Sequence, residues 1–478
     1  MKRFSAIMFF LVVMNAVIAQ TTLTNPVFIA NPYLQVGYSP SANALQLLWI
    51  TSDIDADWKV EYKRSKDAAW EKTGEVVFKK IAVANSPAHR VYQVTLADLV
   101  LGSVFDYRVS KTNTVVFSAS AHAPKSKEQD YRFVVFGDVG AGTKEAKEIA
   151  MGVYNAKADM ILIPGDIVYN NGLISEYNKR FWPIYNTTTV DTAGVPLMSR
   201  IPFVASVGNH DLITRNLDRY PDALAYYYYW QQPLNGPAGK EGVVYPALTG
   251  TDENKKAFLE SAGKSYPSMA NFSYDYGNAH WLVIDGNNYV DWTDKELTDW
   301  VAKDLADAKD AQWRFVMFHQ PGFNSSRGHY EQQQMRLLSP IFEEAKVDVV
   351  FTGHVHNYQR SYPLKFRSDN KTGYQLVSGV NKTPAGKIVT GAWTLDKIYN
   401  GIDKTKPNGV IYLVTGAGGQ SLYNKEQQDD KDSWQGFTTK FISKVHSFTV
   451  ADVKGKTLII KQLSPDGKEV DSFVITKD

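Results

Sequence analysis

The chain has 478 residues, of which 44% are hydrophobic and 21% charged, and its 52 basic side chains nearly balance its 50 acidic ones. This length and apolar content suit one large globular domain and a smaller one, and the balanced charge predicts no surface for nucleic acids or anionic membranes. The chain contains no cysteine. Disulfides, a disulfide-linked dimer, thiolate metal ligands and a cysteine nucleophile are therefore excluded, whereas a non-covalent dimer stays open.

Residues 1–19 are predicted to be a secretory signal peptide. Lys2 and Arg3 give a basic start, the run from Ala6 to Val17 is almost entirely apolar, and a small residue, Ala19, precedes the expected cleavage point. The apolar run is short for a membrane span. We therefore expect a secreted or periplasmic protein with no stable membrane insertion after cleavage; an uncleaved signal anchor is the alternative.

Residues 26–124 are predicted to form a β-sandwich. Short strand-like runs separated by turn residues are typical of this fold, and seven strands would fit. The clearest runs are 45–51, 58–62, 91–96 and 104–110. The segment 96–109 resembles a corner of fibronectin type III domains, although Phe105 stands where that family usually has a tyrosine. Tyr107 is expected to supply an inward or cross-strand aromatic ring.

A different pattern follows the polar stretch 124–130. Apolar runs alternate with helical segments, which indicates an α/β core whose mixed sheet is covered by helices and which extends over residues 131–478. The predicted strands are 133–136, 160–163, 203–207, 281–284, 315–318 and 347–351, and the clearest helices are 144–154 and 294–308. The last runs, 447–453, 457–463 and 470–475, alternate like antiparallel strands and are expected to form an edge sheet.

Most of these core strands end in a potential metal ligand. A single strand followed by Asp or His would mean little, because Asp also caps helices and begins turns. The series here is longer, with Asp138, Asp166, Asn209, His319 and the neighbouring pair His354 and His356. Ligands gather at the carboxyl ends of strands in such sheets, so we expect these side chains to converge on one edge of the sheet. Carboxylate, amide and imidazole donors suit zinc, iron and manganese.

With these residues in this order, the chain resembles the purple acid phosphatases, a branch of the calcineurin-like metallophosphoesterases. The resemblance covers essentially the whole mature chain, because plant-type members also carry an N-terminal fibronectin-like sandwich. It implies a dinuclear centre in which Asp166 bridges both metals. The implied ligands are Asp138, Asp166, Tyr169 and His356 for iron(III), and Asp166, Asn209, His319 and His354 for a divalent metal, either zinc, manganese or iron(II).

One position departs from the wider superfamily. Most metallophosphoesterases have Asp-x-His after the first strand, whereas Gly140 stands at that histidine position and offers no side-chain ligand. Tyr169, three residues after Asp166, provides a replacement. A phenolate is a hard, anionic ligand that favours iron(III), and its charge transfer to iron would colour the protein.

The resemblance implies hydrolysis of small phosphate monoesters, as in an acid phosphatase. Two metals lower the pKa of a bound water, and the resulting metal-bound hydroxide would attack in line without a covalent enzyme intermediate. His210 matches the position that contacts phosphate and helps to protonate the leaving alcohol, and His329 matches a further histidine with this task. Gly328 stands where a second loop histidine might be expected, and Arg327 could supply positive charge instead.

Several other features have less specific expected roles. Asp211 is expected to orient His210 or to cap the following turn, and residues 416–419 to allow a close backbone approach near the site. The long segment 216–270 is expected to be a substrate-side loop, and the aromatic run 226–230 within it to be buried packing or, alternatively, a ligand platform. His89 and His122 are expected to be solvated, and His280 to be packed or hydrogen-bonded.

Two alternatives to a monoesterase stay open at this point. The same metals could support a phosphodiesterase that acts on nucleotides or lipid headgroups. In the other alternative, the protein is a binding protein in which the β-sandwich binds a partner and the metal domain is inert.

Overall fold

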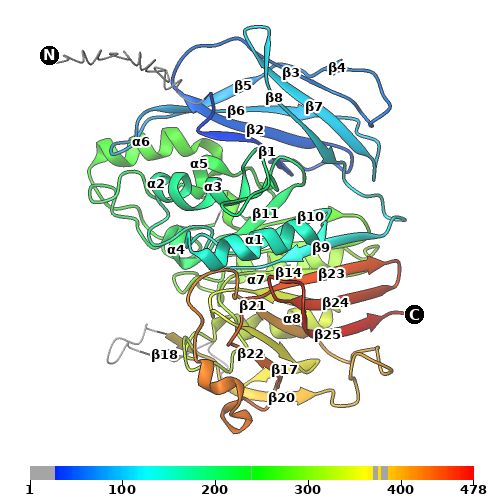
Figure 1. Cartoon of the computed structure of the whole chain (residues 1–478). Helices are drawn as coiled ribbons and strands as arrows, with labels where there is room; N and C mark the ends of the chain where they lie inside the picture. Colours follow the sequence, from blue (N-terminus) through cyan, green and yellow to red (C-terminus); the bar gives the residue numbers. More distant parts are fainter. Residues whose placement is uncertain (1–26, 238, 370–374, 378–385) are drawn as a thin grey trace, which may run out of the picture.

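The structure, a computed structural model, describes residues 27–237, 239–369, 375–377 and 386–478. The predicted signal peptide lies outside the described residues. Within them, no helix is long and apolar enough to cross a membrane. Figure 1 shows a strand-rich N-terminal region at one end of the molecule and a larger region of strands and helices below it.

The N-terminal region consists of two four-stranded antiparallel sheets. One sheet has the order β1 (Ala30–Gln35), β2 (Leu45–Ser52), β6 (His89–Leu96) and β5 (Val77–Ile81); the other has the order β4 (Glu71–Lys72), β3 (Trp58–Tyr62), β7 (Val104–Lys111) and β8 (Thr114–His122). The four predicted runs coincide with β2, β3, β6 and β7. The region has eight strands instead of the seven that the sequence suggested, because the two-residue strand β4 pairs with β3. Apolar residues of both sheets share one core, in which Trp49 and Trp58 are buried.

The predicted corner aromatics are both buried. Phe105 is completely buried, and the Tyr107 hydroxyl donates a 2.9 Å hydrogen bond to the carbonyl of Ser199. Tyr107 thus joins the sandwich to the second region rather than closing a corner within its own sheet. The Tyr62 hydroxyl donates a 2.9 Å hydrogen bond to the carbonyl of Ala97, next to the predicted corner segment.

A six-stranded sheet begins the second region. Its order is β11 (Phe203–Ser206), β10 (Met160–Pro164), β9 (Tyr131–Val135), β23 (Phe448–Lys454), β24 (Thr457–Leu463) and β25 (Glu469–Thr476). The first three strands are parallel, and β23 joins β9 in the antiparallel sense. The last three strands were expected to form an edge sheet of their own; instead they complete half of this sheet, because the edge of β9 remains available for pairing.

A seven-stranded sheet provides the other half of the core. Its order is β12 (Phe272–Tyr276), β13 (Ala279–Val283), β14 (Trp313–Met317), β15 (Val349–Thr352), β21 (Ile411–Thr415), β16 (Tyr358–Ser361) and β22 (Thr438–Ile442). The central strands β13, β14, β15 and β21 are parallel. Two small hairpins lie beside it, β17 (Leu364–Ser368) with β20 (Gly391–Leu395) and β18 (Gln375–Val377) with β19 (Gly386–Ile388).

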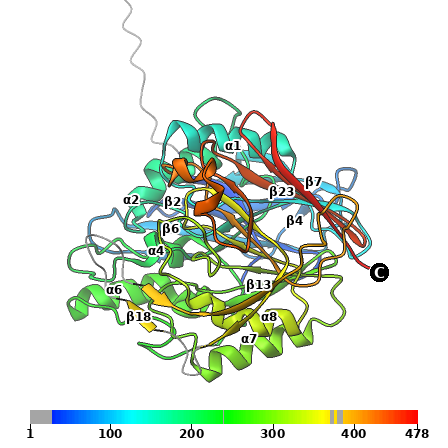
Figure 2. The same ribbon diagram turned by 90° about the horizontal axis from the view of Figure 1, so that it is seen from below.

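The two large sheets pack face to face with helices outside them. Their shared apolar core includes Phe133, Trp281 and Phe351, and the Phe133 and Trp281 rings lie 5.1 Å apart. The helix α1 (Lys144–Ala156) covers the outer face of the first sheet and α7 (Lys295–Asp307) that of the second. Figure 2 shows α1 and α7 on opposite sides of the molecule. The remaining α-helices are α2 (Ile174–Glu176), α3 (Trp182–Tyr185), α4 (Asn209–Leu212), α5 (Tyr226–Tyr229), α6 (Asp252–Ala262) and α8 (Ser339–Glu344).

The aromatic run 226–230 lies between the sandwich and the sheets of the second region. All its side chains are buried, so it is packing and not an exposed ligand platform. Tyr33 of β1 donates a 2.7 Å hydrogen bond to the carbonyl of Tyr229, and α6 packs against β5. Much of the segment 216–270, predicted to be a substrate-side loop, therefore serves this contact.

His89 differs from its prediction. It is 2% exposed, not solvated, and its Nε2 lies 2.9 Å from the Tyr229 hydroxyl. Its position in an otherwise polar sequence hid this role, because the partner is 140 residues away. His122, also expected to be solvated, is half-exposed, but its Nδ1 lies 3.5 Å from Oδ1 of Asp159.

Candidate metal centre

The predicted ligands converge where strands of both sheets end. Asp138, Asp166 and Asn209 follow β9, β10 and β11 of the six-stranded sheet, whereas His319 and the pair His354 and His356 follow β14 and β15 of the seven-stranded sheet. The prediction of a single sheet edge was therefore wrong. Alternating strands and helices cannot reveal that the strands divide between two sheets, but the carboxyl ends of both sets still meet in one place.

The first cluster contains Asp138, Asp166 and His356. One possible ligand atom from each lies within 4.8 Å of the others. The Tyr169 hydroxyl donates a 3.0 Å hydrogen bond to Oδ1 of Asp138 and lies 3.3 Å from Nε2 of His356. Two carboxylates, an imidazole and a phenol thus surround one point, and all four side chains are buried.

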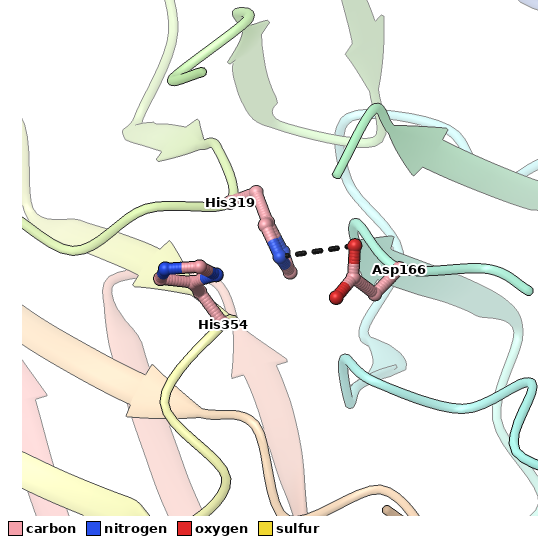
Figure 3. Close-up of side chains that lie close together, drawn as sticks. All are labelled: Asp166, His319 and His354. Atoms are coloured by element: carbon pink, nitrogen blue, oxygen red, sulfur yellow. Dashed lines mark ion pairs between the residues drawn. The ribbon is translucent and has the colours of Figure 1, made fainter. Parts of the chain in front are cut away.

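The second cluster contains Asp166, His319 and His354, again with ligand atoms within 4.8 Å of one another. Figure 3 shows these three side chains together, with Nε2 of His319 directed at Asp166, 3.2 Å from its Oδ1. Nε2 of His354 and Oδ1 of Asn209 are among the buried polar atoms of the described residues that have no hydrogen-bond partner, and Nε2 of His319 faces only the Asp166 carboxylate. Such atoms cost free energy unless something satisfies them, and a cation would do so. The donor set therefore fits a metal pair with Asp166 common to both clusters.

Backbone carbonyls fix the orientation of two imidazoles. Nδ1 of His319 donates to the carbonyl of Pro164 at 2.7 Å, and Nδ1 of His356 donates to that of Ser421 at 2.8 Å. A carbonyl can only accept, so Nδ1 carries a hydrogen in both rings, and Nε2 is the ring atom left to face a cation. Both rings are therefore prepared to coordinate through Nε2.

The loops after the strands adopt unusual backbone conformations. Asp138, Asp166 and His354 have φ values of 63°, 52° and 67°, a region that non-glycine residues rarely occupy. Strained residues of this kind cluster at functional sites. The predicted close approach of residues 416–419 is confirmed, because a Cβ added to Gly418 would lie 2.1 Å from the carbonyl oxygen of Gly137.

Gly140 cannot carry a side chain in this fold. An added Cβ would lie 1.9 Å from the carbonyl oxygen of Ile167 and 2.5 Å from Cα of Val168. The segment that leads from Asp166 to Tyr169 occupies the space instead. Tyr169 reaches the first cluster from this segment, as the sequence predicted for a residue that compensates for Gly140.

The buried charges influence one another strongly. Burial lowers the pKa of His319, but Asp166 outweighs burial and raises that pKa to about 9. Burial would raise the pKa of Asp166, whereas His319 and His210 lower it. Burial and the nearby histidines lower the pKa of His354. In the absence of a cation, the centre therefore holds its charge in the pair Asp166 and His319, with His354 neutral.

His210 lies at the border of the centre. Its backbone N–H donates to Oδ1 of Asp166 at 2.9 Å, and its Nδ1 donates to the carbonyl of Asn170 at 2.8 Å, which leaves Nε2 for another partner. Asp211 does not orient this ring. It caps the turn instead, because its carboxylate accepts from the backbone N–H groups of Gly208 at 2.8 Å and Ile167 at 3.1 Å.

The loop with His329 also reaches the centre. The His329 and His354 rings have centroids 4.0 Å apart. Burial, followed by the charges of His356 and His319, lowers the pKa of His329 to about 4. Arg327 does not point its charge to the centre: its guanidinium is largely exposed and lies 3.5 Å from Glu426.

Sequence reasoning missed Ser421 and Tyr423. Both follow the glycine-rich turn after β21, and the Tyr423 ring stacks on the His356 ring at a centroid distance of 4.1 Å. No ligand spacing marks these residues, since one acts through its carbonyl and the other through its ring. The glycine-rich turn was the one signal that a chain segment passes close to the site.

Residues 131–358 match the family model of calcineurin-like phosphoesterases. The match begins with β9 and ends just after His356, so it contains every predicted metal ligand. This part of the chain is therefore a calcineurin-like phosphoesterase domain.

Within this class, several relatives of the chain are named as purple acid phosphatases. It is 25% identical to "Probable inactive purple acid phosphatase 27" of Arabidopsis thaliana, over 70% of this chain and 55% of that protein. It is 23% identical to purple acid phosphatase 22 of the same species, over 66% of this chain and 64% of that protein. The chain thus spans between about half and two thirds of the length of these relatives. The matches confirm the predicted resemblance to purple acid phosphatases.

A solved structure is similar over most of the chain. The purple acid phosphatase PPD1 from yellow lupin (Lupinus luteus) seeds has a TM-score of 0.65, covers 94% of this chain and 74% of its own, and is 18% identical. At this identity the likeness shows the fold alone. It confirms the predicted fold class, a strand-rich N-terminal region followed by α/β sheets of a phosphoesterase domain.

Proposed function

We propose that the protein is a secreted acid phosphatase that hydrolyses phosphate monoesters at a dinuclear metal centre. One observation carries the proposal: two clusters of buried metal-ligand side chains share Asp166 at the carboxyl ends of the two sheets. The relatives support it in part, since some are named as phosphatases and others as probable inactive ones. Every ligand position of this chain holds a suitable side chain, which favours the active form.

The residues divide between two metals. Asp138, Tyr169 and His356 would hold iron(III), and the remaining three, Asn209, His319 and His354, would hold zinc, manganese or iron(II), with Asp166 in common. The bound pair would neutralise phosphate charge and make water a stronger nucleophile. In the hydrolysis, the oxygen of water forms a bond to phosphorus and the ester P–O bond breaks. The leaving alkoxide takes up a proton and departs as the alcohol.

Two histidines would assist substrate binding and protonation of the leaving group. His210, oriented by the Asn170 carbonyl, would contact the phosphate and supply the proton to the leaving oxygen. His329 would contribute a neutral imidazole to substrate binding, because its pKa of about 4 leaves it uncharged above that pH.

The experiment is metal analysis and hydrolysis by one purified sample. We expect two metals per chain and faster cleavage of p-nitrophenyl phosphate than of bis(p-nitrophenyl) phosphate. Asp166→Asn should lose metal and more than about a hundredfold in kcat/KM, because even outer partners of ligands are worth about 10- to 100-fold. Asp159→Asn removes a buried carboxylate that accepts from the Arg132 N–H, just before the same strand, and should retain metal.

The remaining outcomes select the alternatives. Preferential cleavage of the diester would identify a phosphodiesterase. If the parent protein contains no metal and hydrolyses neither substrate, the result would favour the second alternative, a binding protein whose metal domain is inert.

We also propose the division into a signal peptide (1–19), a fibronectin-like sandwich (26–124) and a catalytic domain (131–478). Strands β1 to β8 pair only with one another among the described residues, which supports the boundary between the last two. N-terminal sequencing of the exported protein should begin at Gln20, and limited proteolysis should cut within 124–130. A mature protein that retains Met1 would contradict the signal peptide.

A further inference from the structure

Tyr423 lies at the border of the metal centre with its ring held from several sides. The ring stacks on the ligand His356 at 4.1 Å with an interplanar angle of 19°, and its centroid lies 5.6 Å from that of His329. The backbone N–H of Tyr423 donates to the carbonyl of His356 at 3.0 Å. The hydroxyl of Ser443 donates to the Tyr423 carbonyl. Both the ring and the backbone are therefore positioned relative to a metal ligand.

The Tyr423 hydroxyl is available for a ligand. The side chain is only partly buried, and no described residue forms a hydrogen bond with the hydroxyl. A phenol hydroxyl can donate one hydrogen bond, so this group is a donor without a partner among the described residues.

Gly328 lies directly beside this ring. An added Cβ at Gly328 would lie 3.4 Å from Cδ2 of Tyr423, so a longer side chain at this position would compete with the ring for the same space. The φ angle of Gly328 is not positive, so a side chain is not excluded by backbone conformation. The loop with His329 thus contributes one imidazole, and Tyr423 fills the place beside it.

We propose that Tyr423 is a phosphate-binding residue whose hydroxyl donates a hydrogen bond to a phosphate oxygen of the substrate, in the space that Gly328 leaves open. This inference rests on the proposed phosphatase function. The Tyr423 hydroxyl would then be one of several groups around the phosphate. His329 lies on one side of the Tyr423 ring, and the candidate ligand His356 lies against the face of the ring. A hydrogen bond to a charged partner is among the stronger ones, and a desolvated position strengthens it.

The test compares Tyr423→Phe with the parent in two measurements on samples of known metal content. One is binding of inorganic phosphate by calorimetry, and the other is kcat/KM for p-nitrophenyl phosphate. Phenylalanine keeps the ring stacked on His356, so metal content should not change. Phosphate binding should weaken by about 10- to 100-fold, which corresponds to loss of one hydrogen bond to a charged group.

A matched control and a replacement sharpen the test. Tyr154→Phe changes a partly buried tyrosine of α1 whose ring lies against Arg200, and should bind phosphate like the parent. The double change Tyr423→Ala with Gly328→His places an imidazole in the vacated space and should bind phosphate more tightly than Tyr423→Ala alone.

The outcomes separate this inference from the function on which it rests. A parent that hydrolyses the monoester while Tyr423→Phe binds phosphate within twofold of the parent overturns the role of Tyr423 alone. A parent that neither binds phosphate nor hydrolyses the ester overturns both proposals.

Discussion

The hydroxyl of Tyr169 donates a 3.0 Å hydrogen bond to Oδ1 of Asp138 at the centre of the first ligand cluster. The two side chains come from different strand ends, and burial, followed by the charge of Asp138, raises the pKa of the phenol. The phenol would therefore give up its proton only to a strong Lewis acid. This relationship supports the proposal that Tyr169 would bind iron(III) in preference to a divalent ion.

Tyr169→Phe should remove the visible absorption of the iron-containing protein, because a phenolate ligand produces charge transfer to iron(III). The measurement is an absorption spectrum with metal analysis on the same sample. Tyr185→Phe is the matched control, since Tyr185 is also buried and donates to the carbonyl of Val139 rather than to a ligand. A band of unchanged intensity in Tyr169→Phe would exclude tyrosinate ligation.

His210→Ala should lower kcat by about 10²- to 10⁴-fold for an alkyl phosphate, because the leaving alkoxide loses its proton donor. The loss should be much smaller for p-nitrophenyl phosphate, whose leaving group needs little protonation. Comparing the two substrates at equal metal content measures this difference. His122→Ala serves as control, because His122 lies 3.5 Å from Asp159, which precedes β10, whereas the candidate ligands follow the strands. An equal loss with both substrates would argue against proton donation by His210.

His280 should make the stability of the protein depend on alkaline pH. Burial lowers the pKa of His280, but its hydrogen bonds to Asp275 at 2.8 Å and Asp304 at 2.9 Å outweigh burial and raise that pKa to about 9. A raised folded-state pKa stabilises the protein fully below the unfolded value of about 6.5 and loses this effect as the pH rises through 9. The contribution lost is about 3 kcal/mol.

Urea denaturation of the parent and of His280→Gln at pH 6 and pH 10 measures this effect. Between the two pH values, the free energy of unfolding should fall more in the parent than in the variant. The difference between the two decreases should be about 3 kcal/mol. Equal losses in both proteins would mean that His280 does not change its charge in this range. The comparison between variants removes the contribution of other groups that titrate there.

Tyr229→Phe should lower the free energy of unfolding by about 1 to 3 kcal/mol, because Nε2 of the buried His89 loses its 2.9 Å partner. Denaturation at neutral pH gives the value, and Tyr154→Phe, which breaks no hydrogen bond among the described residues, provides the reference. A loss below about half a kcal/mol would show that water replaces the phenol as the hydrogen-bond partner of His89. Water would then have access to the contact between the sandwich and the second region.

Local patterns predicted the core strands and the candidate ligands that the structure brings together, for a physical reason. A buried strand needs a continuous apolar run, and a ligand after its carboxyl end needs a turn residue, so both leave marks in adjacent positions. Asp138, Asp166 and His319 were found in this way. Gly140 and Tyr169 could be related to each other from the sequence, because Gly140 lacks the usual histidine side chain and Tyr169 supplies a possible ligand in its place.

What the sequence did not show depends on contacts between distant segments. The division of the core into two sheets depends on which strand edges pair, and β9 accepts β23 from a position more than 300 residues further on. His89 was misread because its partner Tyr229 belongs to another region. Tyr423 gave no sign of its place beside His356, because stacking requires no particular spacing in the chain.

The ligands come from both sheets in nearly equal numbers, and this distribution has a consequence for folding. A cation held by Asp138 or Asp166 and by a histidine from β14 or β15 is a crosslink between two layers that otherwise adhere through apolar contact. Because a ligand that binds only the folded chain stabilises it by mass action, the melting temperature should rise with metal occupancy. The proposed catalytic centre would then also be part of the contact between the two sheets. A chelator that removes the metals would abolish activity and lower the stability of the fold at the same time.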